Sequence, residues 1–176
     1  MRSLADLLDL TGRSALVTGG AGHIGLAAAE ALLEQGARVA LLDLDPAACA
    51  RAVAGLEERW PGRALALACD LGDEAATRAA ARQAMEAFGG LDILVHSAAY
   101  VGTTKVPGWA VPFDQQTVAA WDAGMRVNLT AAFVLVQEAR QALAASGHGS
   151  VILVSSIYGV VGSDAAVYAG TSMNAD

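Results

Sequence analysis

A glycine-rich turn near the start of the chain has the residue types and spacing that can bind a phosphate group. It reads Thr18-Gly19-Gly20-Ala21-Gly22-His23-Ile24-Gly25, between a short apolar run and a segment of helical pattern. The start of a helix presents unpaired backbone N–H groups and a partial positive charge, and glycines leave that backbone open to an anion. After a first strand, such a turn predicts a site for the pyrophosphate of a dinucleotide. The alternative is a tight glycine turn that binds nothing.

An acidic residue ends the second apolar run at the position where dinucleotide folds bind a ribose. Asp43 lies 18 positions after Gly25. A carboxylate there accepts hydrogen bonds from the ribose hydroxyls and repels a 2′-phosphate. Leu44 follows, so no arginine stands next to Asp43 to favour NADP. The pattern favours NAD over NADP, unless Asp43 is only a solvated acid at a strand end.

The segments that must position these residues alternate between strand and helix. Short apolar runs predict strands over 14–18, 38–43, 64–69, 92–97 and 150–155. Helices are predicted over 22–35, from Asp45-Pro46 to about 58, over 73–88, and as two helices or a bent pair within 115–145. Continuous apolar strands separated by helices are typical of a parallel sheet covered on both faces. We therefore predict a single α/β domain over 1–176, with a Rossmann-type, doubly wound sheet.

The composition excludes several classes of protein. Hydrophobic residues make up 55% of the chain and charged residues 16%, which argues against disorder. A net charge of −7 argues against nucleic-acid binding. Cys49 and Cys69 lie in apolar segments without metal-binding spacing, as expected of core residues in a reducing cytoplasm. Asp6 and Asp9 interrupt the N-terminal apolar run, and no uncharged stretch is long enough to span a membrane.

From about Arg13 to Tyr158 the chain resembles the short-chain dehydrogenase/reductase family. The residues that carry the resemblance are the TGGAGHIG turn, Asp70 after the third strand, LDILVHSAA over 91–99, Asn128 in RVNLTAAF, and Ser155-Ser156 at the end of the fifth strand. The fourth-strand motif of the family is usually Asn-Asn-Ala-Gly, where this chain has His96, Ser97, Ala98 and Ala99.

The resemblance implies an NAD-dependent oxidoreductase with strand order 3-2-1-4-5, lacking the last strands of the family. Hydride would pass between the nicotinamide and a small alcohol or carbonyl substrate, and the protein would be a homodimer or homotetramer. Ser156 would polarise the carbonyl, and Asn128 would hold a water of the proton relay. The implied cofactor-binding residues are Gly19, Gly22, His23, Ile24, Gly25, Asp43, Asp70, Leu71, Ser97, Ala98 and Ala99. Asp70 could instead cap the next helix, and Ser156 could merely form a turn.

The proton donor of the family, a tyrosine followed four residues later by lysine, is missing from this chain. Its three tyrosines are followed at that spacing by Thr, Gly and Ser, and the only lysine is Lys105. In one interpretation Tyr168, 12 positions after Ser156, is the catalytic tyrosine and Ser172 replaces the lysine. In the favoured one, VYAGTSMNAD resembles an insertion found in part of the family, and the pair lies beyond Asp176. We expect the 176-residue chain to be inactive and to associate through an apolar fifth-strand edge.

Two other interpretations remain open. A nucleoside-diphosphate-sugar epimerase or dehydratase of the extended branch is compatible with the glycine spacing and with His23. A non-catalytic nucleotide-binding module is compatible with the missing tyrosine–lysine pair, although Asn128 and Ser156 argue against it.

Overall fold

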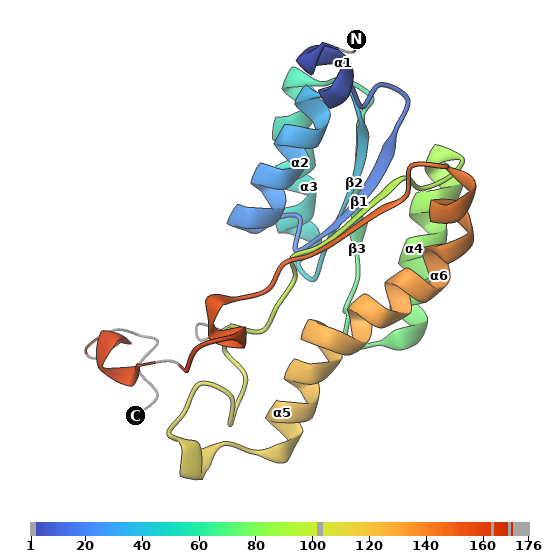
Figure 1. Ribbon diagram of the computed structural model, residues 1–176. Helices are drawn as coiled ribbons and strands as arrows, with labels where there is room; N and C mark the ends of the chain where they lie inside the picture. Colours follow the sequence, from blue (N-terminus) through green and yellow to red (C-terminus); the bar gives the residue numbers. More distant parts are fainter. Residues whose placement is uncertain (1–2, 102–103, 163, 169, 171–176) are drawn as a thin grey trace.

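The computed structural model describes residues 3–101, 104–162, 164–168 and 170, and its centre is a five-stranded parallel sheet (Figure 1). The strand order is β3-β2-β1-β4-β5, which confirms the predicted Rossmann-like α/β fold. Every neighbouring pair runs parallel. The strands are β1 (Ser14–Thr18), β2 (Arg38–Asp43), β3 (Ala64–Ala68), β4 (Ile93–His96) and β5 (Ser150–Leu153).

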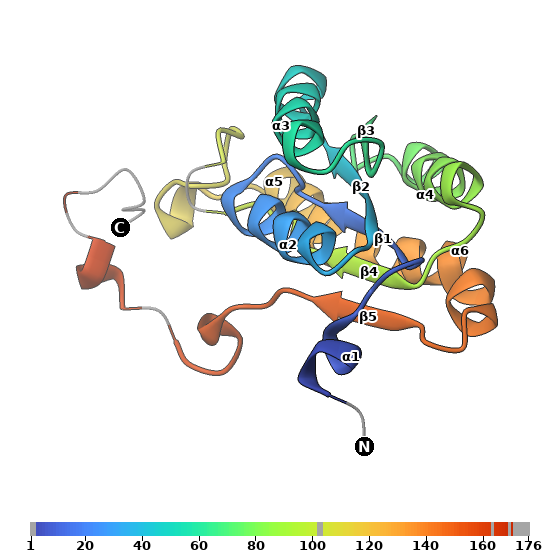
Figure 2. The ribbon, with the colours of Figure 1, turned by 90° about the horizontal axis from the view of Figure 1, so that it is seen from above.

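Helices cover both faces of this sheet (Figures 1 and 2). The α-helices of the described part of the chain are α1 (Leu4–Leu8), α2 (His23–Glu34), α3 (Pro46–Arg59), α4 (Glu74–Phe88), α5 (Val118–Met125) and α6 (Ala131–Ala145). α2 and α3 pack on one face, and α4 and α6 on the other. Asp45, Asp73 and Thr117 begin α3, α4 and α5 as side-chain caps.

Alternation along the strands divides the core into two layers. Leu16 of β1 packs in the cluster on the α4 and α6 side, whereas Ala15 and Val17 pack in the cluster on the α2 and α3 side. All three side chains are fully buried. Side chains on both faces of β1 are therefore buried, which explains why its sequence is a continuous apolar run.

Three strands are shorter than predicted. β3 ends at Ala68 instead of Cys69, β4 covers 93–96 instead of 92–97, and β5 ends at Leu153 instead of Ser155. On one side of β4, the early end follows from the end of the neighbouring strand β1. β1 ends at Thr18 and turns into the glycine loop, so the Ser97 N–H donates to the Thr18 hydroxyl (3.2 Å) rather than to a strand carbonyl.

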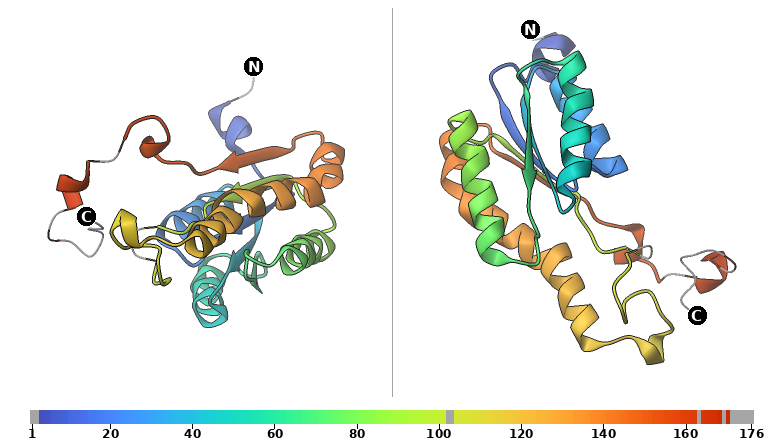
Figure 3. Two further views of the ribbon diagram at one scale, coloured as in Figure 1. Left: turned by 90° about the horizontal axis from the view of Figure 1, so that it is seen from below. Right: turned by 180° about the vertical axis from the view of Figure 1, so that it is seen from behind.

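The predicted bent pair within 115–145 is a nearly continuous rod. A π-helical turn, Arg126–Thr130, joins α5 to α6, and Figure 3 shows the rod extending past the carboxyl ends of the strands. Helix α1 was not predicted, nor were the short 3₁₀ turns Phe113–Gln115, Ile157–Gly159 and Ala165–Tyr168.

The sheet ends at β5, whose apolar side chains are half-exposed. Val151, Ile152 and Leu153 expose 41%, 48% and 54% of their surface. Within the described part of the chain, β5 pairs with β4 alone. This arrangement agrees with the expected apolar edge.

Candidate functional site

A cavity of about 380 Å³ opens where the carboxyl ends of four strands meet. It includes the β1–β4 boundary, where the strand order reverses and where doubly wound sheets bind ligands. The lining residues are Gly19, Gly22, Leu42, Asp43, Leu44, Cys69, Asp70, Leu71, Ser97, Ala98, Ala99, Tyr100, Thr104 and Val127.

The glycine turn forms one wall of this cavity and leaves its backbone bare. Gly19 has φ +64°, and a Cβ there would lie 2.9 Å from the Cα and N atoms of Ala98. A Cβ at Gly25 would collide with the carbonyl oxygen of Gly19, so the start of α2 can approach β1 only with glycine there. Gly22, the N-cap of α2, provides no side-chain hydrogen bond. The turn therefore fits a group that binds main-chain amides, as a pyrophosphate does.

Asp43 faces the cavity from the end of β2 and also holds the glycine turn. Its Oδ2 accepts a hydrogen bond from the Ala21 N–H (3.0 Å), and its Oδ1 accepts one from the Asp45 N–H (3.3 Å). The residue is only partly buried. Its carboxylate thus links the predicted phosphate-binding and ribose-binding segments.

Asp70 lines the cavity rather than capping a helix. It accepts a hydrogen bond from the Gly72 N–H (2.8 Å), whereas Asp73 accepts one from the Ala76 N–H at the start of α4 (3.0 Å). The alternative in which Asp70 is the helix cap is therefore wrong. Leu71 is buried beside it and contributes apolar wall.

The ends of β1 and β4 are joined by a compact hydrogen-bonding cluster. The Thr18 hydroxyl oxygen accepts from the Ser97 and Ala98 N–H groups (both 3.2 Å) and lies 3.0 Å from Nδ1 of His96. Nε2 of His96 lies 3.1 Å from the carbonyl oxygen of Val127. His96 is 3% exposed, and this burial lowers its pKa below the usual 6.5, while the bond to Val127 opposes that shift.

Asn128 lies in the π-helical turn and binds the loop that follows β4. Its Oδ1 accepts a hydrogen bond from the Tyr100 N–H (2.6 Å), and its Nδ2 donates to the Tyr100 carbonyl (3.3 Å). This pairing explains a helix-disfavoured residue at this place. The ring of Tyr100 contacts that of Trp109 edge-on, with centroids 5.6 Å apart.

Ser156 lies beyond β5, outside the residues that line the cavity. Its Oγ accepts a hydrogen bond from the Tyr158 N–H (3.2 Å). The hydroxyl groups of Tyr158 and Tyr168 are 2.5 Å apart, and this hydrogen bond raises the pKa of Tyr168. Tyr168 is therefore paired with another tyrosine hydroxyl in this arrangement.

The cavity gathers most, but not all, of the predicted cofactor residues. Gly25 is buried behind the turn, and His23 and Ile24 are exposed on the first turn of α2 outside the lining. Sequence reasoning did not include several lining residues, namely Leu42, Leu44, Cys69, Tyr100, Thr104 and Val127. Most of them adjoin a predicted residue in the sequence at the end of a strand. Position at a strand end is therefore the sequence signal that would identify them.

The described residues show neither a metal centre nor a membrane-spanning helix. Among them, no group of three or more His, Cys, Asp and Glu side chains is arranged to hold a metal ion. No helix in the same part of the chain is long and apolar enough to cross a membrane.

A Rossmann-like sheet with a glycine turn and an acidic second-strand end defines a dinucleotide-fold protein. The comparison with protein families is specific: residues 13–173 match the short chain dehydrogenase family. The chain belongs to this family of oxidoreductases, the short-chain dehydrogenases/reductases.

Characterised relatives share about a third of their residues with this chain. A 2,5-dichloro-2,5-cyclohexadiene-1,4-diol dehydrogenase of Sphingobium indicum is 36% identical over 151 residues, which are 86% of this chain and 57% of the relative. D-threitol dehydrogenase of Mycolicibacterium smegmatis is 35% identical over 147 residues, 84% of this chain and 54% of the relative. The chain thus spans little more than half the length of these relatives.

Solved structures of dehydrogenases/reductases superpose on this chain as well. A short-chain dehydrogenase/reductase of Brucella melitensis, described as a glucose/ribitol dehydrogenase, superposes with a TM-score of 0.76 at 29% identity. That match covers 88% of this chain and 61% of the other. A dehydrogenase/reductase of Sinorhizobium meliloti superposes with a TM-score of 0.71 at 38% identity, over 81% and 54% of the two chains.

Proposed function

We propose that this chain is the cofactor-binding part of an NAD(H)-dependent oxidoreductase that interconverts a small alcohol and its carbonyl compound. The observation that carries the proposal is the cavity in which bare glycine backbone and the Asp43 carboxylate face the same space. A relative of similar identity, 2-dehydro-3-deoxy-L-rhamnonate dehydrogenase (NAD(+)) of a Sphingomonas strain, supports the choice of cofactor.

Each predicted residue has a role in this proposal. The turn from Gly19 to Gly25 holds the pyrophosphate through main-chain amides, Asp43 binds the ribose, and Asp70 and Leu71 flank the adenine. Backbone at Ser97, Ala98 and Ala99 borders the inner ribose. When bound, the nicotinamide supplies hydride-transfer chemistry.

The proposed catalytic residues are Ser156, which follows β5, and Asn128, which lies in the π-helical turn. The Ser156 Oγ accepts the Tyr158 N–H, which leaves the hydroxyl proton free to be donated to a carbonyl oxygen and to stabilise charge there. The side chain of Asn128 is occupied by Tyr100, so its part in a proton relay would come from its backbone carbonyl.

Cofactor titration tests the proposal directly. Purified chain is titrated with NADH and NADPH while nicotinamide fluorescence is followed. We expect saturable binding with a lower Kd for NADH. Absence of saturable NADH binding to folded protein would refute the proposal.

An Asp43→Asn variant tests the basis of the NAD preference. Asparagine keeps an oxygen that can accept the Ala21 N–H, so the turn is preserved while the negative charge is removed. We expect the ratio of the NADPH Kd to the NADH Kd to fall by about tenfold, since one lost charge repulsion is of that order. Glu86→Gln, which removes a carboxylate outside the cavity, should leave the ratio unchanged.

Binding of NADH does not imply catalytic turnover by this chain, because the chain contains no Tyr-x-x-x-Lys, the pair that supplies the proton donor of the family. We propose that the 176-residue chain binds NADH without catalysing multiple turnovers. NADH oxidation is measured with a panel of small aldehydes and ketones. Sustained turnover would contradict this proposal, while binding alone also fits the second candidate, a non-catalytic dinucleotide-binding module.

The same two candidates can be separated with a chimaera. Residues 1–176 are joined to the remaining part of D-threitol dehydrogenase. NADH binding with carbonyl-dependent oxidation favours the oxidoreductase, and NADH binding without oxidation favours the module.

We further propose a homodimer or homotetramer in the cytoplasm. Along the rod of α5 and α6, Trp121, Met125, Leu129 and Phe133 recur every four residues and are exposed, as expected of a surface that a second copy covers. Cys49 and Cys69 are both free and buried, which suits a reducing compartment. Sedimentation equilibrium of the chain and of a Phe133→Glu variant tests the assembly; equal masses would count against this surface.

A further inference from the structure

His96 is a buried histidine to which the dinucleotide proposal assigns no role. It stands at the end of β4, and its ring lies between two segments that line the cavity. On one side Nδ1 is 3.0 Å from the Thr18 hydroxyl, and on the other Nε2 is 3.1 Å from the Val127 carbonyl. The ring therefore connects β1 to the π-helical turn.

The partners of the imidazole determine where its proton lies. A carbonyl oxygen can only accept, so Nε2 must carry hydrogen and donate to Val127. In a neutral ring Nδ1 then accepts, and the Thr18 hydroxyl donates to it. The hydroxyl oxygen keeps two lone pairs, and these accept the N–H groups of Ser97 and Ala98. The other tautomer would leave both the Thr18 proton and the Val127 carbonyl without these partners.

The π-helical turn explains why the Val127 carbonyl is available to His96. In an α-helix this carbonyl would accept the N–H of Ala131, four residues later. Here the Ala131 N–H bonds to Arg126, five residues earlier. The side chain of His96 therefore donates to a carbonyl whose α-helical partner, the Ala131 N–H, bonds elsewhere.

We propose that His96 is a positioning residue of the cavity, acting as a neutral imidazole protonated at Nε2. Through Val127 it holds the turn that carries Asn128, and through Thr18 it holds the Ser97–Ala98 backbone. His96 thereby sets the distance between two walls of the cavity, which are formed by segments far apart in the sequence. Only its effect on NADH binding rests on the proposed function; the tautomer and the wall positions do not.

Nuclear magnetic resonance of the chain labelled with ¹⁵N in histidine tests the tautomer. Signals of His96 are assigned by their loss in His96→Gln. We expect hydrogen on Nε2 and a bare Nδ1 at pH 7. A ring protonated on Nδ1, or on both nitrogens, would overturn the proposal.

Amide hydrogen exchange and NADH titration test the positioning. His96→Leu removes both hydrogen bonds, whereas His96→Gln retains one donor and one acceptor that can replace them. Val95→Ala is the matched control, because it removes packing from the same strand on the opposite sheet face. We expect His96→Leu to accelerate exchange at Ser97 and Ala98 and to raise the NADH Kd by about tenfold, the order expected when buried polar groups lose their partners.

The two control variants separate positioning from a general loss of stability. In His96→Gln, the exchange rates of the Ser97 and Ala98 amides and the NADH Kd should be close to the parent values. In Val95→Ala, these two amides should exchange no faster than the loss of global stability accounts for. Unchanged exchange in His96→Leu, or an equal effect of Val95→Ala, would overturn the positioning role. If His96→Leu does not fold, the tautomer measured in the wild-type chain decides: hydrogen on Nε2 with a bare Nδ1 supports the proposal, and any other protonation overturns it. If no protein binds NADH, exchange still tests His96 while the proposed function fails separately.

Discussion

At the scale of single residues, two helical glycines of this chain have opposite reasons to be there. A Cβ at Gly25 would meet the Gly19 carbonyl, whereas a Cβ at Gly55 on α3 would meet nothing within 4 Å. Gly25 is therefore required by the close approach of α2 to the glycine turn. Gly55 has no such constraint, and it destabilises helix α3 relative to a residue with a side chain, such as alanine.

We predict that Gly25→Ala lowers the free energy of unfolding by about 1–3 kcal/mol, as for an overpacked site. Gly55→Ala should raise it by about 0.5–1 kcal/mol through helix propensity. Urea unfolding followed by circular dichroism measures both. Equal effects of the two variants would mean that the contact at Gly25 is relieved by a small backbone shift.

The protonation of His96 predicts a pH dependence of stability. Because burial lowers the folded-state pKa, the unfolded chain binds this proton more readily. The stabilisation from the neutral ring is complete above the unfolded pKa of about 6.5 and is lost progressively as the pH falls toward the folded pKa. The loss cannot exceed about 1.4 kcal/mol per pH unit for one proton.

Urea unfolding at pH 7.5, 6.5 and 5.5 measures this dependence. The parent chain should become less stable in the lower half of the range. His96→Gln, which has no ring to protonate, should show a smaller decline. Parallel curves for the two proteins would assign the decline to other groups.

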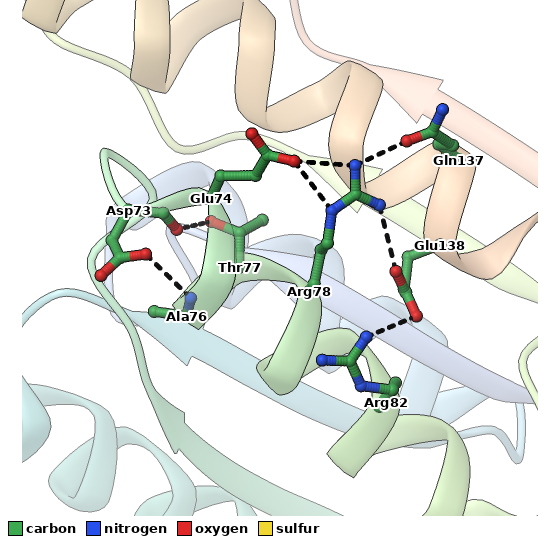
Figure 4. Close-up of polar contacts among 8 residues, drawn as sticks. All are labelled: Asp73, Glu74, Ala76, Thr77, Arg78, Arg82, Gln137 and Glu138. Atoms are coloured by element: carbon green, nitrogen blue, oxygen red, sulfur yellow. Dashed lines mark hydrogen bonds and ion pairs between the residues drawn. The ribbon is translucent and has the colours of Figure 1, made fainter.

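At the scale of elements, helices α4 and α6 are joined by a cluster of polar side chains (Figure 4). Arg78 donates to Glu74 (2.9 Å), Glu138 (3.1 Å) and Gln137 (2.6 Å), and Arg82 donates to Glu138 (2.8 Å). The hydrogen bonds from Arg82 and Arg78 lower the pKa of Glu138. The cluster ties the two helices that cover one sheet face.

We predict that Glu138→Gln lowers stability at pH 7 by a small amount that shrinks with added salt. Since the folded pKa of Glu138 is lowered, its stabilisation is present above the ordinary value of 4.5 and disappears as the pH falls through the folded value. Thermal unfolding at pH 7 and pH 3 measures the difference. Glu86→Gln, on α4 but outside the cluster, is the control, and an equal loss there would refute a specific effect.

At the scale of the whole molecule, β5 is the least covered part of the sheet. Its apolar side chains are about half exposed, and its outer edge has no strand beside it in the described part of the chain. Unpaired apolar edges recruit other strands. The chain also spans little more than half the length of its relatives.

We predict concentration-dependent association that Ile152→Lys weakens by about tenfold or more, because a charge at a strand edge opposes pairing. Val160→Lys is the control, since it replaces an equally apolar and more exposed residue outside the sheet. Light scattering over a concentration series measures the masses. Equal weakening by both variants would show that charge alone, and not the β5 edge, controls association.

The sequence by itself determined the five strands and the longer helices in their order along the chain, because these depend on local chemistry. Apolar runs predicted all five strands, and Asp45 and Asp73 marked two helix starts. The glycine turn and Asp43 were recognised as parts of one site, because the carboxyl ends of parallel strands lie together.

Only the tertiary structure decided where the strands end and what holds the cavity walls. Thr18 and His96 are 78 residues apart, and nothing in the local pattern around either one predicts that they share a hydrogen bond. The π-helical turn is equally hidden, because nothing in the local pattern of residues 126–130 distinguishes a π-helical turn from an α-helical one, and the bond from His96 to Val127 comes from another element. Hydrogen bonds between distant segments form only after the sheet has brought those segments together, so a local sequence pattern does not contain them.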